Sequence, residues 1–258
     1  MKIDAILTPA ELPALAKRDL SETLCVVFDV LRATSTFVTA LHNGAKAVIP
    51  VGEISEALAF KNSEFGIRNS ESVLLGGERD GVKIRAAQTG GIDFDLGNSP
   101  RECTPEKVRG RTIVSTTTNG TRALRACAAA KTVLAGSFLN LAATAEFIEE
   151  LQPVEVLLVC AGTREENADE DVLAAGALCE LLARGDARPT FPDSTEIARR
   201  AWAQAKPDLA AAVRNATNAR RLLAIPELRD DVVFCLQRDV FPLIARMEAD
   251  GAIRRKPT

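Results

Sequence analysis

The chain of 258 residues contains one histidine, His42, one tryptophan and no tyrosine. A zinc site built on several histidines is therefore excluded, as is any catalytic apparatus that uses histidine repeatedly. Its six cysteines form no CxxC pair, and the chain is too long to need disulfide cross-links. We therefore expect reduced, mostly buried thiols and a cytoplasmic protein.

Neither charge nor apolar residues are concentrated enough to indicate nucleic acid or a membrane as a partner. The formal net charge is −3 at pH 7, and the only basic run is the short tail 254–256. Nucleic-acid-binding proteins usually carry a strongly basic surface. No run approaches the roughly 18 apolar residues of a spanning helix, and the first residues, with Asp4, lack the apolar core of a signal peptide. We expect no nucleic-acid partner and no membrane segment; a homodimer is left open.

Three common phosphate-handling motifs are also missing. The sequence has no G-x-x-x-x-G-K-[ST] loop, and Asp29 lacks the second aspartate of a D-x-D signature. Cys103 and Arg109 have the C-x₅-R spacing, but the residues between them include no glycine and one glutamate. Such a segment cannot curl around an anion, so a cysteine phosphatase is excluded.

Apolar strand-like runs alternate with amphipathic helical runs over the first 185 residues. This alternation predicts βαβ units and a largely parallel sheet covered on both faces. We predict one α/β domain over 1–258, with two lobes and a boundary near 186 as an option. The predicted strands are 24–28, 47–51, 73–75, 112–115, 133–135, 154–160, 231–236 and 241–247, and the predicted helices are 34–42, 54–61, 120–130, 141–151, 170–184, 195–204 and 209–223.

The segment 26–36 places an acid and a guanidinium between a buried strand and a helix. Asp29 follows the strand, Arg32 follows closely, and three hydroxyls come next, from Thr34, Ser35 and Thr36. Ligands of open α/β sheets bind beyond the carboxyl ends of strands. An acid able to hold Mg²⁺ beside an arginine able to bind phosphate indicates a phosphate-ester site. A simple helix cap with a structural ion pair is the equally weighted alternative.

A second polar segment, 115–122, lies between another predicted strand and helix. It holds several small polar residues, a glycine and an arginine, which indicates an anion site because one capping residue alone would suffice for the helix. The candidates for binding are Thr117, Thr118, Asn119, Gly120, Thr121 and Arg122.

Further candidates lie in the weakly periodic segment 76–105 and in later acid clusters. Segments of this kind often carry function. The first group is Glu78, Arg79, Asn98 and Ser99; the acids are Glu170, Asp171 and Asp231. Asn-Ser-Pro is also a good turn, and acids at a helix start are favoured by its dipole, so these assignments have simpler alternatives. Because Mg²⁺ usually takes one or two carboxylates, not all the acids can be ligands.

Taken together, these segments resemble the 2-phosphosulfolactate phosphatase family, the Mg²⁺-dependent enzymes of coenzyme M biosynthesis. The matching stretches, over about residues 20–240, are DVLRATST (29–36), LGGER (75–79), FDLGNSP (94–100), TTTNGTRAL (116–124), GSFLN (136–140), VCAG (159–162), EDVLAAG (170–176) and DDVVFC (230–235). Segment 215–222 departs from the Ser…His-Gly pattern expected there. The resemblance implies a three-layer α/β/α fold with a mixed sheet.

The resemblance also implies an enzyme that hydrolyses a small anionic phosphomonoester, (R)-2-phospho-3-sulfolactate, to 3-sulfolactate and phosphate. On this hypothesis Asp29 binds Mg²⁺ with Glu170 or Asp171 and Asp231, or Asp29 accepts the phosphoryl group; Arg32 stabilises the transition state. The 117–122 segment would bind phosphate or a second anion, with Arg79 and Asn98 as candidates for the carboxylate or sulfonate. Another small phospho-acid as substrate, and a non-catalytic metabolite sensor, are the alternatives.

Overall fold

The computed structural model describes residues 1–63, 72–184 and 188–256. The strands are β1 (Lys2–Ile6), β2 (Thr23–Phe28), β3 (Ala47–Pro50), β4 (Val73–Arg79), β5 (Val82–Lys83), β6 (Thr112–Thr116), β7 (Thr132–Gly136), β8 (Glu155–Cys160), β9 (Ile244–Met247) and β10 (Ile253–Lys256). The α-helices are α1 (Leu12–Leu15), α2 (Ala33–His42), α3 (Ile54–Asn62), α5 (Ala86–Thr89), α6 (Pro105–Val108), α7 (Gly120–Ala126), α8 (Leu141–Leu151), α9 (Asp169–Leu182), α10 (Asp193–Ala205), α11 (Leu209–Val213), α12 (Thr217–Leu223) and α13 (Arg229–Cys235), and the 3₁₀ helices are η1 (Pro9–Glu11), η2 (Pro100–Glu102) and η3 (Phe138–Asn140).

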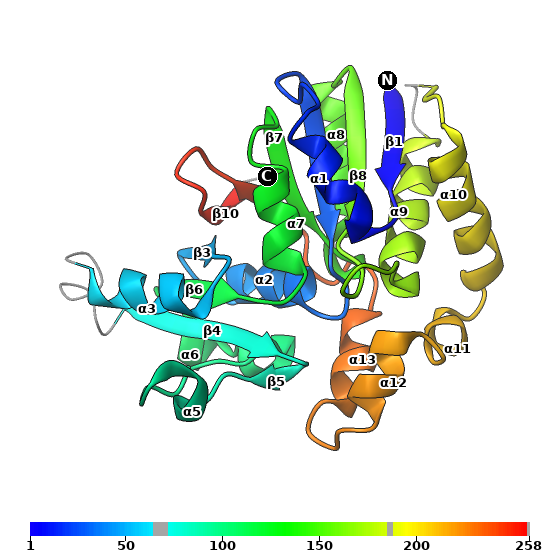
Figure 1. Ribbon diagram of the computed structural model, residues 1–258. Coiled ribbons are helices and arrows are strands. Elements are labelled where there is room, and N and C mark those ends of the chain that lie inside the picture. The colour runs from blue at the N-terminus through cyan, green and yellow to red at the C-terminus, as the bar shows by residue number, and fades with distance from the viewer. Residues whose placement is uncertain (64–71, 185–187, 257–258) are drawn as a thin grey trace.

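Within these residues, ten strands form one mixed sheet in the order β1-β8-β2-β7-β9-β10-β3-β6-β4-β5. Two parallel groups make up most of it, β1, β8, β2 and β7 on one side and β3, β6 and β4 on the other. The antiparallel β9–β10 hairpin lies between them and pairs with β7 and β3. Because the sheet twists, the second group lies crosswise to the first (Figure 1).

Two hydrophobic cores lie on opposite faces of the first group of strands. Alternation along β2 sends Leu24, Val26 and Phe28 to one core and Cys25 and Val27 to the other. Helices α8, α9 and α10 cover the first face, and α1, α2 and α7 cover the second. The predicted three-layer α/β/α fold with a mostly parallel, mixed sheet is confirmed.

Most predicted elements are confirmed, some with shifted ends. Helix α8 has the predicted bounds 141–151, and the predicted strand 24–28 corresponds to β2. Strand β4 continues to Arg79 where the prediction stopped at 75, so part of the segment 76–105 is regular. Strands β1 and β10 were not predicted, and the basic tail 254–256 is part of β10.

The predicted strand 231–236 is wrong, because these residues belong to helix α13. Short apolar runs rich in valine do not distinguish a strand from one face of a helix. Asp231, Val232 and Cys235 are buried while Val233 is 68% exposed, which is the spacing of a helix face.

The predicted helix 209–223 is two helices, α11 and α12, which are separated around Ala216. Ala216 has an extended backbone and precedes α12 as its N-cap. This break lets α12 take its own direction, and it carries Asn218 and Arg221 to the site described below. The predicted lobe boundary near 186 lies outside the described residues.

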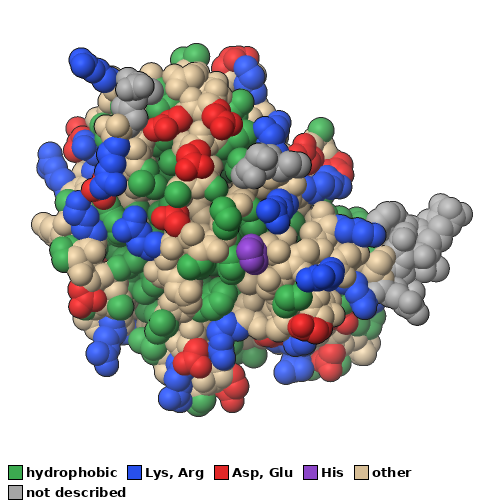
Figure 2. All heavy atoms as spheres, turned by 180° about the vertical axis from the view of Figure 1, so that it is seen from behind, with side chains coloured by type: hydrophobic (Ala, Val, Ile, Leu, Met, Phe, Trp, Pro, Cys, Tyr) green, Lys and Arg blue, Asp and Glu red, His purple; other side chains and the backbone are tan. Residues whose placement is uncertain are grey.

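All six cysteines are buried and unpaired, as predicted. In the described part of the chain, no helix has the length and apolar character needed to cross a bilayer. The ring of His42 stacks on Phe241 with centroids 4.1 Å apart, on the face seen in Figure 2, where acidic and basic side chains are interspersed.

Candidate active site

A cleft lies where the carboxyl ends of four strands meet. Asp29 follows β2, Thr163 follows β8, Glu78 lies at the end of β4, and Thr118 follows β6. The two parallel groups therefore point their carboxyl ends at one place, which is where open α/β sheets bind ligands. The cleft is partly open to solvent, and its walls are Asp29, Leu31, Arg32, Glu78, Asp80, Gly81, Asn98, Thr118, Asn119, Thr163, Arg164 and Arg221.

Asp29 is 7% exposed and has one carboxylate oxygen fixed by the backbone. Its Oδ1 accepts a hydrogen bond from the N–H of Ala33 at 3.0 Å. Burial raises its pKa to about 6 and the nearby Glu78 charge adds to this, against the backbone N–H of Ala33 and Gly120 and the charge of Arg32. A Cβ at Gly120 would lie 2.6 Å from Asp29 Oδ2, so only glycine allows this approach.

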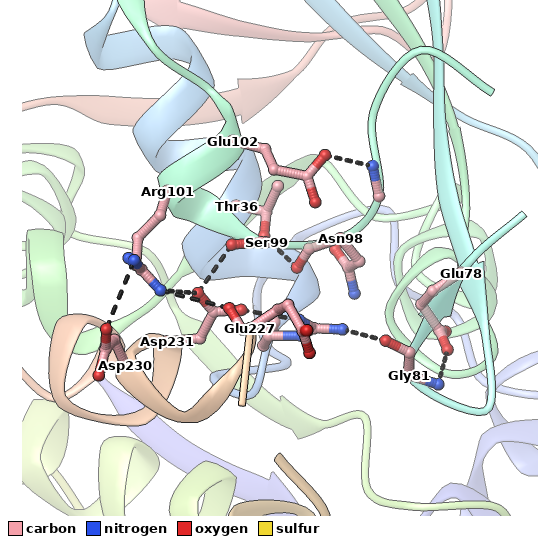
Figure 3. Close-up of polar contacts among 12 residues, drawn as sticks. Thr36, Glu78, Gly81, Asn98, Ser99, Arg101, Glu102, Glu227, Asp230 and Asp231 are labelled. Carbon is pink, nitrogen blue, oxygen red and sulfur yellow. Dashed lines mark hydrogen bonds and ion pairs between the residues drawn. The ribbon is translucent and has the colours of Figure 1, made fainter. Parts of the chain in front are cut away.

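Glu78 holds two loops together from the end of β4. Its Oε1 accepts from the N–H and hydroxyl of Thr118, at 2.9 and 3.0 Å. Its Oε2 accepts from Gly81 N–H at 2.6 Å, the contact drawn in Figure 3. Glu78 is nevertheless part of the cleft wall. A carboxylate with several N–H and O–H partners is a rigid, negatively charged surface for whatever binds beside it.

Arg32 lines the cleft and is held by two buried partners. Its Nη1 lies 2.7 Å from Asp231 Oδ2, and its Nη2 donates to the carbonyl of Gly81 at 2.6 Å. The other oxygen of Asp231 accepts from the hydroxyl of Ser99 at 2.7 Å (Figure 3). The structure therefore places Asp231, predicted as a metal ligand, and Ser99, predicted to bind substrate, as supports of Arg32.

Two more buried acids lie behind Asp29, at the start of α9. Asp171 accepts from Val30 N–H at 2.8 Å and from Gly162 N–H at 3.0 Å, so it joins the loops after β2 and β8. Glu170 accepts from the amide of Asn218 at 2.7 Å through Oε1, while its Oε2 is buried without a partner. Burial raises the pKa of both; that of Glu170 reaches about 7, and the charge of Asp29 raises both further.

The three hydroxyls after Arg32 point away from the cleft. Thr34 donates to the carbonyl of Asp29, Ser35 to that of Val30, and Thr36 to that of Asn98, all at 2.8 to 2.9 Å. These residues form the first turn of α2 and are buried, so each hydroxyl pairs with a nearby carbonyl. The expectation that they bind substrate is corrected: they shape the 29–36 turn.

The threonine segment 117–122 divides between cleft and interior. Thr118 and Asn119 line the cleft. Thr117 and Thr121 bond to each other's backbone and side chain at 2.9 to 3.3 Å, and Arg122 pairs with exposed Glu165 at 2.7 Å. Only two of the six predicted residues therefore form the cleft wall, because the other side chains lie on the inner and outer faces of the turn.

Arg79 was predicted to bind a carboxylate or sulfonate, and the structure turns it away from the cleft. Its guanidinium donates to the carbonyl of Glu78 at 2.7 Å and to Thr116 Oγ1 at 3.1 Å. Consecutive side chains of a strand point to opposite faces, so Glu78 and Arg79 cannot both face the cleft. Asn98 does face it, with its Oδ1 buried and unpartnered.

No motif in the sequence indicated the wall formed by Thr163, Arg164 and Arg221. Asn218 connects this wall to the acids, because its amide nitrogen donates to Thr163 Oγ1 at 2.7 Å as well as to Glu170. Arg221 in turn donates to Asn218 Oδ1 at 3.0 Å. The i, i+3 spacing of Asn218 and Arg221 places them on one helical face, but only the packing of α12 shows where that face points.

Comparison with known proteins gives a consistent result over nearly the whole chain. The family profile described as 2-phosphosulpholactate phosphatase matches residues 7–250. A protein of Caldanaerobacter subterraneus subsp. tengcongensis named probable 2-phosphosulfolactate phosphatase is 39% identical over 240 residues, covering 92% of each chain. Proteins with the same name from Thermotoga petrophila (40% over 219 residues, 85% of this chain and 86% of the relative) and Picosynechococcus (33% over 254 residues, 98% of each) are also similar.

The family profile covers every residue that lines the cleft, from Asp29 to Arg221. The profile and the relatives together confirm the resemblance read from the sequence motifs and the assignment to the phosphoric monoester hydrolases at the level of the family. The chain belongs to the 2-phosphosulpholactate phosphatase family.

Proposed function

We propose that this protein hydrolyses a small phosphomonoester with additional negative charge, releasing phosphate, and that the ester is 2-phospho-3-sulfolactate. The observation that carries the proposal is the single cleft that joins buried carboxylates and guanidinium groups at the ends of four strands. We call Asp29 and Glu78, with Glu170 and Asp171 behind them, the acidic side, and Arg32, Arg164 and Arg221 the arginine side. The names of the relatives support the choice of substrate.

The acidic side fits a divalent cation. Its four carboxylates are all at least nine-tenths buried, and burial together with mutual repulsion raises the pKa of three of them. Glu170 Oε2 and Asn98 Oδ1 are buried oxygens without partners, and hard oxygens are the ligands that Mg²⁺ prefers. In residues 1–63, 72–184 and 188–256 no three His, Cys, Asp or Glu side chains gather as a ready metal centre. Mg²⁺ needs only one or two carboxylates, with water and phosphate oxygens for the rest.

Asp29 and Glu170 are the residues that would hold Mg²⁺. When bound, the ion would supply positive charge to the phosphoryl oxygens as negative charge develops on them. Asp171, with both oxygens already on backbone N–H groups, would support the loops that carry these ligands. Asp231, on the far side of Arg32, has the different task of fixing that guanidinium.

The chain's own groups prepare the reacting phosphate in three ways. Asp29, with its pKa at about 6, is mostly ionised above pH 7, so its carboxylate is available as a ligand or as the phosphoryl acceptor. Arg32, held by Asp231 and Gly81, presents a fixed positive charge without reorganisation. Glu78 fixes the Thr118 and Gly81 loops that form the cleft walls.

Phosphate release from a panel of phosphomonoesters, with and without Mg²⁺, tests the proposal. We expect 2-phospho-3-sulfolactate to give the highest kcat/KM, simple alkyl phosphates the lowest, and chelation of Mg²⁺ to abolish turnover. Tight binding of the panel without phosphate release would instead identify a metabolite sensor. A higher kcat/KM for another phospho-acid would retain the reaction and replace the substrate.

A further inference from the structure

Arg221 differs from the other arginines of the cleft in its partners. Arg32 is paired with buried Asp231 at 2.7 Å, and Arg164, at the exposed mouth, lies 3.8 Å from Asp80. Among the described residues, no carboxylate lies within ion-pair distance of Arg221: its Nη2 donates to the neutral Asn218, and its Nε is buried without a partner. A guanidinium N–H left buried and unpaired costs free energy, so this position favours an anion from outside the chain.

Arg221 lies beside the same turn that holds Arg32. A Cβ at Gly81 would lie 3.6 Å from Arg221 Nε, and the Gly81 carbonyl accepts from Arg32 Nη2 at 2.6 Å. Both guanidinium groups therefore adjoin Gly81, whose φ of +82° keeps that place free of a side chain. Arg32 is paired with Asp231, whereas none of the described carboxylates forms an ion pair with Arg221.

From this difference, which rests on the proposed function, we propose that Arg221 binds the non-reacting anionic group of the substrate, a carboxylate or sulfonate, and so sets specificity for phosphoesters with a second acidic group. The phosphoryl group would lie toward the acidic side, and the second anion toward α12. Asn218 positions the guanidinium, since its Oδ1 accepts from Nη2 while its amide is held by Thr163 and Glu170. A guanidinium suits either group because its N–H donors match paired oxygens.

The test compares Arg221→Met with Arg220→Met, its exposed neighbour on the same helix. Each full-length variant is assayed with four esters: 2-phospho-3-sulfolactate, one ester with only a carboxylate, one with only a sulfonate, and p-nitrophenyl phosphate. We expect Arg221→Met to lower kcat/KM for 2-phospho-3-sulfolactate about 30- to 100-fold, mostly through KM, the loss typical of a deleted charged hydrogen bond. Its p-nitrophenyl phosphate activity should change less than about threefold, and Arg220→Met should change neither.

Two further readouts separate the outcomes. The two single-anion esters show which group Arg221 binds. If kcat/KM falls in Arg221→Met for the carboxylate ester, Arg221 binds the carboxylate; if it falls for the sulfonate ester, Arg221 binds the sulfonate. The affinity of the product 3-sulfolactate, measured by calorimetry, should fall with Arg221→Met and be partly restored in Arg221→Lys. Equal losses on all esters, or unchanged sulfolactate binding, would overturn the inference while leaving the hydrolase proposal intact; no phosphate release by the wild-type protein from any ester would refute the proposed function itself.

Discussion

The two sides of the cleft are held in place in different ways. On the acidic side, Asp29, Glu78 and Asp171 each accept from backbone N–H groups within hydrogen-bond distance, so their positions follow from how the strands end. On the arginine side, Arg32 depends on a carboxylate from α13 and Arg221 on an amide from α12. Asp29 and Glu78 are thus positioned at the ends of strands, whereas Arg32 and Arg221 depend on helices late in the chain, and Glu170 connects the two sides through Asn218 of α12. On our proposal, the acidic side and Arg32 serve the reaction at the phosphoryl group, and Arg221 serves the choice of substrate.

Replacing Asp29 by Asn should lower activity more than any other single substitution in the cleft. Asparagine can still accept from Ala33 N–H through its Oδ1, so the turn is retained while the charge is lost. Removal of the central anionic oxygen should lower kcat by about 10³-fold or more, whether it serves as ligand or acceptor. Phosphate release measures the loss, and circular dichroism checks the fold. Substantial retained activity would remove Asp29 from both roles.

The Arg32–Asp231 pair should dominate the stability of the arginine side. Asp231→Ala leaves a buried guanidinium unpaired and should destabilise the fold by about 3 to 5 kcal/mol. Arg101→Met removes a 40% exposed partner, 3.6 Å from the same carboxylate, and should cost less than about 1 kcal/mol. Urea unfolding followed by fluorescence of the single tryptophan measures both. Equal losses of unfolding free energy in the two variants would show that the buried Arg32–Asp231 pair does not dominate the stability of the arginine side.

Glu170 should make stability fall as pH rises in the absence of metal. A carboxyl whose pKa is raised in the folded protein keeps its proton longer there than in the unfolded chain. The folded state is therefore weakened as pH rises from the unfolded pKa, about 4.3, to about 7, and the full effect remains above that. Glu170→Gln removes this effect and should stabilise the metal-free protein at pH 8 by about 1 to 3 kcal/mol, and much less at pH 5.

Added Mg²⁺ should stabilise the wild-type protein at pH 8 more than it stabilises Glu170→Gln, and so offset the advantage that the variant has without metal. Thermal unfolding at pH 8 should show a larger rise in Tm with Mg²⁺ for the wild-type protein than for Glu170→Gln, because the cation binds the ionised carboxylate. At pH 5 the rise should be small for both. A rise of the same size at both pH values, or in both proteins, would place any bound cation away from Glu170.

The sequence predicted the acidic side better than the arginine side, for a physical reason. Asp29 directly follows a strand and Glu78 lies near the end of one, and side chains at the carboxyl ends of parallel strands meet at one edge. Arg79 was placed incorrectly because its strand extends four residues beyond the predicted end, and alternation then turns it away from Glu78's face. Whether a side chain such as that of Arg79 faces the cleft therefore depends on the residue at which its strand ends.

Arg221 and Asn218 were missed because their destination depends on tertiary packing. Nothing in 215–222 marks a break between α11 and α12, and without that break the direction of α12 cannot be known. Asp231 illustrates the converse: the sequence singled it out, but a short valine-rich run was read as a strand, and its partner Arg32 lies 199 residues away.

A crystal structure of the protein with Mg²⁺, inorganic phosphate and 3-sulfolactate tests the division of the cleft most directly. We predict the metal beside Asp29 and Glu170, phosphate next to it, and the sulfolactate acid group on the guanidinium of Arg221. Phosphate on Arg221 with the organic acid next to Asp29, or all ligands outside the cleft, would contradict this division.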